Sequence, residues 1–206
     1  MSINKTQNNK AFTLIELMIA TTLFTIVMLM GVGALVVSSN SAKASQKLRI
    51  SVDNVNFAME SMTRDIRMGT YFYCGKDSVE MGNITADCDM TYGDYGNMIA
   101  FNPQKAADGT IPPRIAYRLN PRGDGTNSVQ RCDGTASNCS DIVSRDVDIQ
   151  ELKFYVKGST LPALDDVAKG HVQPSVKILI KGVVNVKGIS KSFSLQTMAS
   201  QRSTEY

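Results

Sequence analysis

One carboxylate stands alone in the most apolar part of this 206-residue chain. Glu16 is the only charged side chain between Ala11 and Val37, a run dominated by Leu, Ile, Met, Val and Phe. Ionisable groups inside a membrane-length segment are energetically costly and usually functional. Such a carboxylate can neutralise a cationic partner in a low-dielectric environment, because an unpaired buried charge is strongly unfavourable. Glu16 is therefore the first candidate functional residue.

Four cysteines form a second group of reactive side chains: Cys74, Cys88, Cys132 and Cys139. Outside the cytoplasm they should be oxidised. We favour the pairs Cys74–Cys88 and Cys132–Cys139, because each pair lies within one irregular segment, although three pairings are possible. A four-cysteine zinc site is the alternative, but such sites prefer spacings of roughly two to four residues, and neither spacing here is that short.

Loops rich in Asp, Asn and Gly could hold calcium through their oxygen atoms. They are Gly123–Asn127, residues 131–139, and the stretch that holds Asp87, Asp89 and Asp94. None of these stretches matches an EF-hand, and turn formation accounts for such residues. We therefore expect no metal or cofactor, with calcium as the alternative.

The charge and the motif content argue against several functional classes. There are 22 Lys and Arg residues against 19 Asp and Glu, a net charge of +3. A balance so close to neutral gives no strong case for nucleic acid. The single histidine, His171, lies in a loop flanked by Gly and Pro. The sequence contains no nucleophile elbow, phosphate loop or HExxH motif, so it does not predict an enzyme.

The apolar run from Ala11 to Val37 is long enough to cross a bilayer as a helix. Lys5 and Lys10 ahead of it favour a cytoplasmic N-terminus, although three basic residues on the far side weaken the charge asymmetry. A signal peptide cleaved near Ala42 or Ala44 is the alternative, but its apolar core would be shorter. A plain signal anchor would fit the run but gives no reason for a buried carboxylate.

The stretch "KAFTLIELMIATTLF" resembles the N-terminus of type IV pilins and type II secretion pseudopilins. In that family Gly precedes Phe-Thr-Leu-Ile-Glu, a membrane prepilin peptidase cuts before the Phe, and the new amino terminus is methylated. The resemblance implies cleavage between Ala11 and Phe12, methylation of Phe12, and a role in subunit assembly for Glu16. The chain departs from the family pattern at Ala11, where Gly is usual, so the efficiency of cleavage stays open.

The resemblance also gives Glu16 a partner. Cleavage creates a cationic amine at Phe12, which the carboxylate of a neighbouring subunit can neutralise in a filament of packed helices. The alternative is a carboxylate at the level of the lipid headgroups. Removing the leader also removes Lys5 and Lys10, which lowers the formal charge of the chain from +3 to +1.

Beyond the apolar run, apolar residues recur at spacings of three and four, which predicts an amphipathic helix ending near Gly69. They are Leu48, Val52, Val55, Met59, Met62 and Ile66. We expect this stripe to pack on the C-terminal domain, with a coiled-coil partner as the alternative. The predicted organisation is a leader (1–11), a transmembrane and filament-core helix (12–37), its amphipathic continuation (38–69) and a β-rich domain outside the cytoplasm (70–206).

Alternating patterns predict an antiparallel sheet in the C-terminal domain. The expected strands are residues 97–101, 114–119, 146–158, 175–186 and 191–200. The apolar phase changes at Gln150 and Glu151, which predicts a β-bulge or a break. The fold class is therefore α+β: a long N-terminal helix packed on an antiparallel sheet, as the resemblance also implies.

The function implied is that of a structural subunit of a type IV pilus or pseudopilus, inserted in the inner membrane and then assembled with other subunits. "MESMTRDIR" resembles the helix end of the J or W type of minor subunit. The alternatives are a major pilin, or a tip-located binding pilin for adhesion or DNA uptake. The candidates for binding are Tyr71, Tyr73, Tyr92 and Tyr95, although packing at the helix end is the favoured interpretation of these tyrosines. The expected partners are other subunits, the prepilin peptidase, the assembly platform and membrane lipid, with no nucleic acid.

Overall fold

The computed structural model describes residues 12–76, 85–88, 94–104, 110, 112–135, 137–159, 173–186 and 189–202. The predicted leader with Ala11 lies outside these residues, as do Asp89, Tyr92 and His171. The chain divides into two compact units, Met1–Gln46 and Lys47–Tyr206, which are described separately. One helix, α1 (Leu14–Met68), contributes to both and ends directly before Gly69, as predicted.

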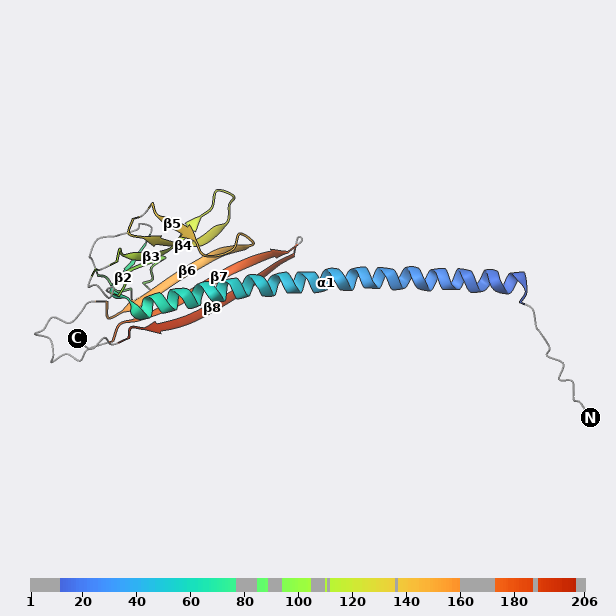
Figure 1. Ribbon diagram of the computed structural model, residues 1–206, viewed down its shortest axis with the longest axis horizontal. Helices are drawn as coiled ribbons and strands as arrows, with labels where there is room; N and C mark the ends of the chain where they lie inside the picture. Colours follow the sequence, from blue (N-terminus) through green and yellow to red (C-terminus); the bar gives the residue numbers. More distant parts are fainter. Residues whose placement is uncertain are drawn as a thin grey trace, which may run out of the picture. The chain divides into compact units, whose positions relative to one another are not determined.

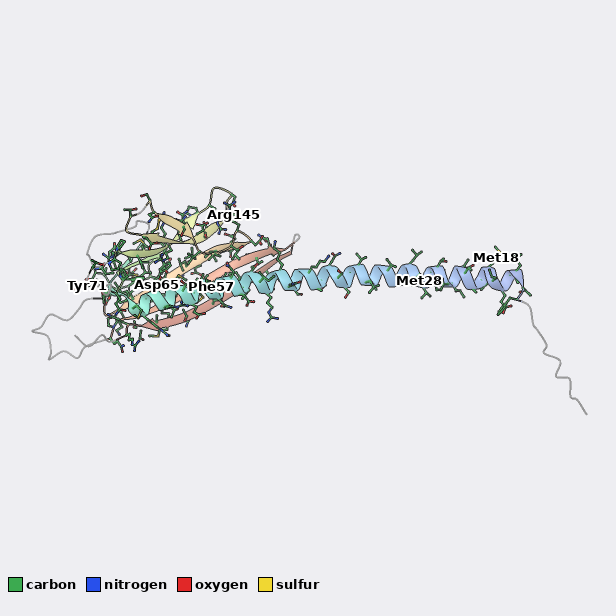
Figure 2. The ribbon with its side chains drawn as sticks, in the orientation of Figure 1. Met18, Met28, Phe57, Asp65, Tyr71 and Arg145 are labelled. Carbon is green, nitrogen blue, oxygen red and sulfur yellow. A yellow bond between two sulfur atoms is a disulfide. The ribbon has the colours of Figure 1, made fainter. Side chains whose placement is uncertain are left out.

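In the first unit, α1 is apolar and long enough to cross a membrane, judged by length and composition. Figure 2 shows Met18 and Met28 projecting from this part of the helix. The polar exceptions are threonines that bond to the helix itself. The Thr22 hydroxyl lies 3.0 Å from the Met18 carbonyl oxygen and 2.9 Å from that of Ile19. These bonds reduce the cost of placing a hydroxyl in lipid.

In the second unit, one face of α1 is buried and carries the predicted stripe. The fully or nearly buried members are Val55, Met59, Met62 and Ile66, and Ala58, which was not predicted, is buried beside them. Leu48 and Val52, nearer the start of the stripe, are partly buried. The helical period of the apolar residues therefore identified the packed face correctly.

The C-terminal strands form two antiparallel sheets, where the sequence suggested one (Figure 1). The first has the order β1 to β5: β1 (Thr70–Gly75), β2 (Met98–Asn102), β3 (Ile115–Pro121), β4 (Asn127–Asp133) and β5 (Cys139–Asp141). The second contains β6 (Val147–Lys157), β7 (Ser175–Val186) and β8 (Ile189–Ser200). Within each sheet every strand pairs with its neighbour in the sequence, so both are simple meanders. Strands β1, β4 and β5 were not predicted.

A bulge in β6 explains its change of apolar phase. The register with β7 shifts between Ile149 and Glu151, as the sequence predicted. The extra residue shifts the alternation of side chains by one position along β6. The apolar residues on both sides of the bulge therefore face the core. The buried residues on either side are Val147, Ile149, Leu152, Phe154 and Val156.

The end of α1 packs against an aromatic cluster. The ring of Phe101 lies 5.9 Å from Phe72 and 6.2 Å from Tyr117, measured between centroids. A Cβ atom at Gly69 would lie 2.5 Å from the Phe101 ring. A glycine is therefore required where the chain leaves the helix, because any side chain would displace that ring.

Candidate processing and assembly site

The start of α1 is built by the residues that the sequence singled out. Phe12 and Thr13 precede the helix. The backbone N–H of Glu16 donates to the Thr13 carbonyl at 3.1 Å and lies 3.4 Å from the Thr13 hydroxyl. Thr13 is therefore the N-cap, and the Thr-x-x-Glu spacing is that of a capping box. This role was not predicted, although the Thr-x-x-Glu signature can be read from the sequence at residues 13–16.

The position of Glu16 in the first turn has an electrostatic consequence. The N-terminus of a helix carries about half a positive charge, which stabilises carboxylates and repels cations. An amine at Phe12 would lie at this positive end and would need a carboxylate nearby. In the isolated chain Phe12 is 80% exposed and Glu16 is also exposed, so both are available to neighbouring subunits.

The comparison with known protein families finds the prokaryotic N-terminal methylation motif at residues 6–32. This range covers the Ala11–Phe12 bond, the cap at Thr13 and the carboxylate of Glu16. This match supports the resemblance of the N-terminal segment to type IV pilins and pseudopilins. No curated protein and no solved structure matches it.

The second unit of this pilin-like chain carries both favoured disulfides. The structure joins Cys74 to Cys88 and Cys132 to Cys139. The pairs were predicted because each was expected within one irregular segment, but the segments that hold the cysteines are more regular than that. Cys74 lies in β1, and the other bridge joins directly paired residues of β4 and β5. Cys88 also pairs with Val156 of β6, so the first disulfide ties one sheet to the other.

In the described part of the acidic loops, the carboxylates of Asp87 and Asp124 accept hydrogen bonds from backbone N–H groups. Asp124 accepts hydrogen bonds from the Thr126 backbone N–H at 3.0 Å and from its hydroxyl at 2.7 Å. These bonds lower the pKa of Asp124. Asp87 accepts from the backbone N–H groups of Gly158 and Ser159. Within the described part of the chain, no three His, Cys, Asp or Glu side chains gather closely enough to hold a metal ion. Turn formation therefore accounts for Asp124, whereas Asp87 binds the backbone directly after β6 through contacts that are distant in the sequence.

The described tyrosines among those considered for binding differ in their surroundings. Tyr71 is exposed and adopts a positive φ of 55° beside the irregular register of β1 with β2. Tyr73 packs on the buried cluster that contains Ala100 and Cys132. Tyr95 lies instead beside Tyr155, with ring centroids 6.4 Å apart. Tyr92 lies outside the described residues.

Two polar clusters that the sequence analysis did not single out hold the second unit together. The Tyr117 hydroxyl donates to Asp65 at 2.7 Å and so links α1 to β3. Arg122, whose side chain is 9% exposed, donates to Asp141 at 3.0 Å and to the Val143 carbonyl at 2.8 Å. It also reaches the carbonyl of Val147, the first residue of β6. Burial, followed by the hydrogen bond to Asp65, raises the pKa of Tyr117 far above its usual range, so the hydroxyl keeps its proton.

Proposed function

We propose that the chain is a structural subunit of a type IV pilus or pseudopilus that is inserted in the inner membrane. The prepilin peptidase cuts it between Ala11 and Phe12, Phe12 is methylated, and the mature subunit joins the filament through α1. The observation that carries this proposal is the methylation motif at a capped helix start with one carboxylate in its first turn.

The role of Glu16 in assembly follows from electrostatics in a dry environment. A filament core of packed apolar helices offers no water to either the amine or the carboxylate. Each charge would be costly alone, and removing one member of a buried pair is strongly destabilising. The pair therefore favours the one axial register that brings Glu16 of one subunit to Phe12 of another.

A second contact for assembly lies on the part of α1 that belongs to the second unit. Ile50 is 61% exposed and Phe57 is 66% exposed, although both are large and apolar. They are seven residues apart and therefore share one helix face. That face lies opposite the buried stripe around Val55 and Met59. We propose that it packs against helices of neighbouring subunits (Figure 2 labels Phe57).

Within the filament, we propose that the chain is a minor or priming subunit. This proposal is supported by the resemblance of "MESMTRDIR" to the J or W type, and by a large domain with two disulfides. Within that stretch Asp65 has a structural role, because it accepts from Tyr117 and lies 3.5 Å from Arg131. A major pilin is the alternative. Quantifying the subunit against the principal filament protein by mass spectrometry distinguishes them, since a minor subunit is present in a small fraction of copies.

The test of assembly is the substitution Glu16→Ala in the cell that makes the filament. We expect normal removal of the leader and loss of the subunit from purified filaments. Glu60→Ala is the matched control, because it also removes one carboxylate from α1 and breaks an exposed pair with Arg64. The Glu60 variant should assemble like the natural chain. Normal incorporation of the Glu16 variant would contradict the proposal.

A further inference from the structure

The last strand, β8, leaves one long edge without a neighbouring strand. β8 ends the second sheet, so only one of its two edges faces β7. Its register with β7 continues without a shift from Ser200 to Ile189. Between Ser192 and Ser200 the strand has no charged residue and no proline. Edge strands are usually protected by a short length, a bulge, a charge or a proline, and this part of β8 has none of these.

A hydrogen bond just beyond β8 identifies the backbone groups that point away from β7. The Gln201 N–H donates to the Pro174 carbonyl at 2.9 Å, so the odd-numbered residues of β8 bond to β7. The even-numbered residues therefore direct their N–H and C=O groups to the outer edge. Arg202 fits this alternation, because its N–H donates to the Arg67 carbonyl of α1 at 2.9 Å. The outward residues of β8 are exposed: they are Ser192, Ser194, Gln196, Met198 and Ser200.

The other outer strand edges in the described part of the chain are short or covered. β5 has only three residues. The outer edge of β1 bonds to Ala86, which accepts from the Cys74 N–H. The edge of β6 that faces away from β7 is bridged by Cys88 and Gly96. The exposed backbone of β8 is therefore an exception within this fold.

A groove between α1 and β8 runs along this edge, and Figure 1 shows the two elements side by side. Two hollows of about 350 and 500 Å³ share Glu60, Thr63 and Arg67 of α1. The first extends to residues 195–197 and the second to residues 200–202. Most of the lining side chains carry hydrogen-bonding groups. The groove therefore suits an extended polypeptide backbone better than the apolar face of a helix.

We propose that the outer edge of β8 binds an extended segment of a partner protein, which adds an antiparallel strand to the sheet. Backbone hydrogen bonds to residues 192–200 supply the affinity, and alternate side chains supply the specificity. On the α1 side, the added side chains lie next to Leu195 and Thr197, which are half-buried beside Met59. The segment therefore alternates apolar, β-branched residues on that side with polar residues on the other.

A second copy of β8 fits this edge less well, an argument that rests on the proposed membrane insertion. β8 and α1 run in the same direction, since residues 195–197 lie near Met59 and residues 200–202 near Met68. Two copies inserted in one membrane through the same end of α1 therefore have β8 strands that run the same way. Such strands pair only in parallel, which is less stable per residue than antiparallel pairing. A segment of another protein has no such restriction.

The first test uses a synthetic peptide with the sequence of β7 (Ser175–Val186), because its side chains already match those of β8 across an antiparallel pair. Amide hydrogen exchange is followed by NMR on the full chain in detergent. We expect the amides of Ser194, Gln196 and Met198 to exchange about tenfold more slowly when the peptide is at about ten times its dissociation constant. The inward amides on either side of Gln196 already bond to β7 and should not change.

The controls each remove one donor. A peptide methylated on the amide nitrogen of Leu179, the residue that matches Gln196, should protect the edge much less. In the chain, Gln196→Pro removes an outward N–H, and an edge position that faces solvent tolerates proline. This variant should fold like the natural chain and lose the protection at its neighbours. Thr197→Pro instead removes a bond to β7 and should destabilise the subunit.

The second test identifies the native occupant in the cell that makes the filament. A photoreactive phenylalanine analogue at Met198 should form an adduct with a different protein, through a peptide that has the expected alternation. Gln196→Pro should abolish the adduct, and the same analogue at Arg145, which is exposed outside the groove, should not form it. A synthetic copy of the captured peptide should protect the edge of β8 as the β7 peptide does.

Three results would overturn the proposal. The first is unchanged exchange of the outward amides at about 1 mM peptide, a weak limit for binding. The second is equal protection by the methylated peptide, which would show that the backbone of the added strand is not recognised. The third is an adduct that joins only two copies of this chain, or no adduct. The exchange experiment uses the uncut chain outside any filament, so its failure would leave the proposed function untouched.

Discussion

Ala11 departs from the glycine that the family usually has before the cleavage site. The extra methyl group must fit the peptidase, so cleavage should depend on the size of this side chain. We expect Ala11→Gly to be processed at least as fast as the natural chain, and Ala11→Leu to accumulate as the precursor. The ratio of precursor to mature chain, followed over time on a gel, checks this. Processing of Ala11→Leu at the natural rate would contradict the assigned cleavage site.

The Arg122–Asp141 pair predicts a specific response to acid. Burial opposes the charged form of Asp141, but hydrogen bonds from Arg122 and Gln130 outweigh it and lower its pKa. A lowered folded pKa stabilises the fold above the ordinary value of about 4, and this stabilisation is lost as pH falls through the folded value. Between pH 7 and pH 3, the free energy of unfolding should therefore decrease less in Asp141→Asn than in the natural chain.

Urea unfolding of the full chain in detergent at the two pH values measures this difference. Asp124→Asn is a useful comparison, because its pKa is also lowered but its bonds are local to one turn. If the free energy of unfolding decreases equally in the natural chain and in Asp141→Asn, the Arg122 contact does not contribute to the pH dependence of stability.

At the level of single residues, the sequence identified groups that are unusual for their surroundings. Glu16 was identifiable because a charge interrupts an apolar run. Arg122 and Asp65 were not, because both lie in ordinary polar stretches and acquire their roles only through partners distant in the sequence. Arg122 reaches Asp141, and Asp65 reaches Tyr117.

At the level of elements, the two disulfides should differ in their contribution to stability. Cys74–Cys88 closes a loop with a sequence separation of 14, and Cys132–Cys139 one of 7. Replacing the first pair by Ala should cost about 3 kcal/mol of unfolding free energy in the chain-entropy model, and replacing the second somewhat less. The difference should be enhanced because Cys88 also joins β1 to β6. A larger loss from the second pair in urea unfolding would contradict this.

The exposed face of α1 gives another prediction. Phe57→Ser should leave the unfolding free energy of the isolated subunit nearly unchanged, because the ring is largely in water. It should nevertheless reduce the amount of subunit in filaments. Met59→Ser, at a buried neighbour, should instead destabilise the subunit itself. If the Phe57 variant assembles normally, the exposed face of α1 is not an assembly contact.

The elements that were predictable are those with a regular apolar period. The helix stripe and strands β2, β3, β6, β7 and β8 have such a period, and the bulge in β6 shows as a change of phase. Strand β4 was missed because its buried positions include Ser128, whose hydroxyl accepts from Arg122. Strand β5 has only three residues, and β1 begins directly after the helix stop at Gly69.

For the whole molecule, total charge and local charge lead to different expectations. The net charge of +3 includes Lys5 and Lys10 of the proposed leader, and a chain cut before Phe12 would have +1. The pairing of β6 with β7 places Lys177 beside Tyr155 and Lys181 beside Glu151, which no count of residues could reveal. The division into two sheets was also beyond the sequence, because it depends on contacts such as those of Arg122.

The central claim is that the chain is a prepilin-type subunit cut before Phe12. Mass spectrometry of the protein purified from its native membrane tests this most directly, because it measures the first residue and its modification together. We predict an N-terminal peptide that begins with methylated Phe12 and contains unmodified Glu16. A mature chain that begins near Ala44 would instead identify the apolar run as a removed signal peptide and would contradict the account.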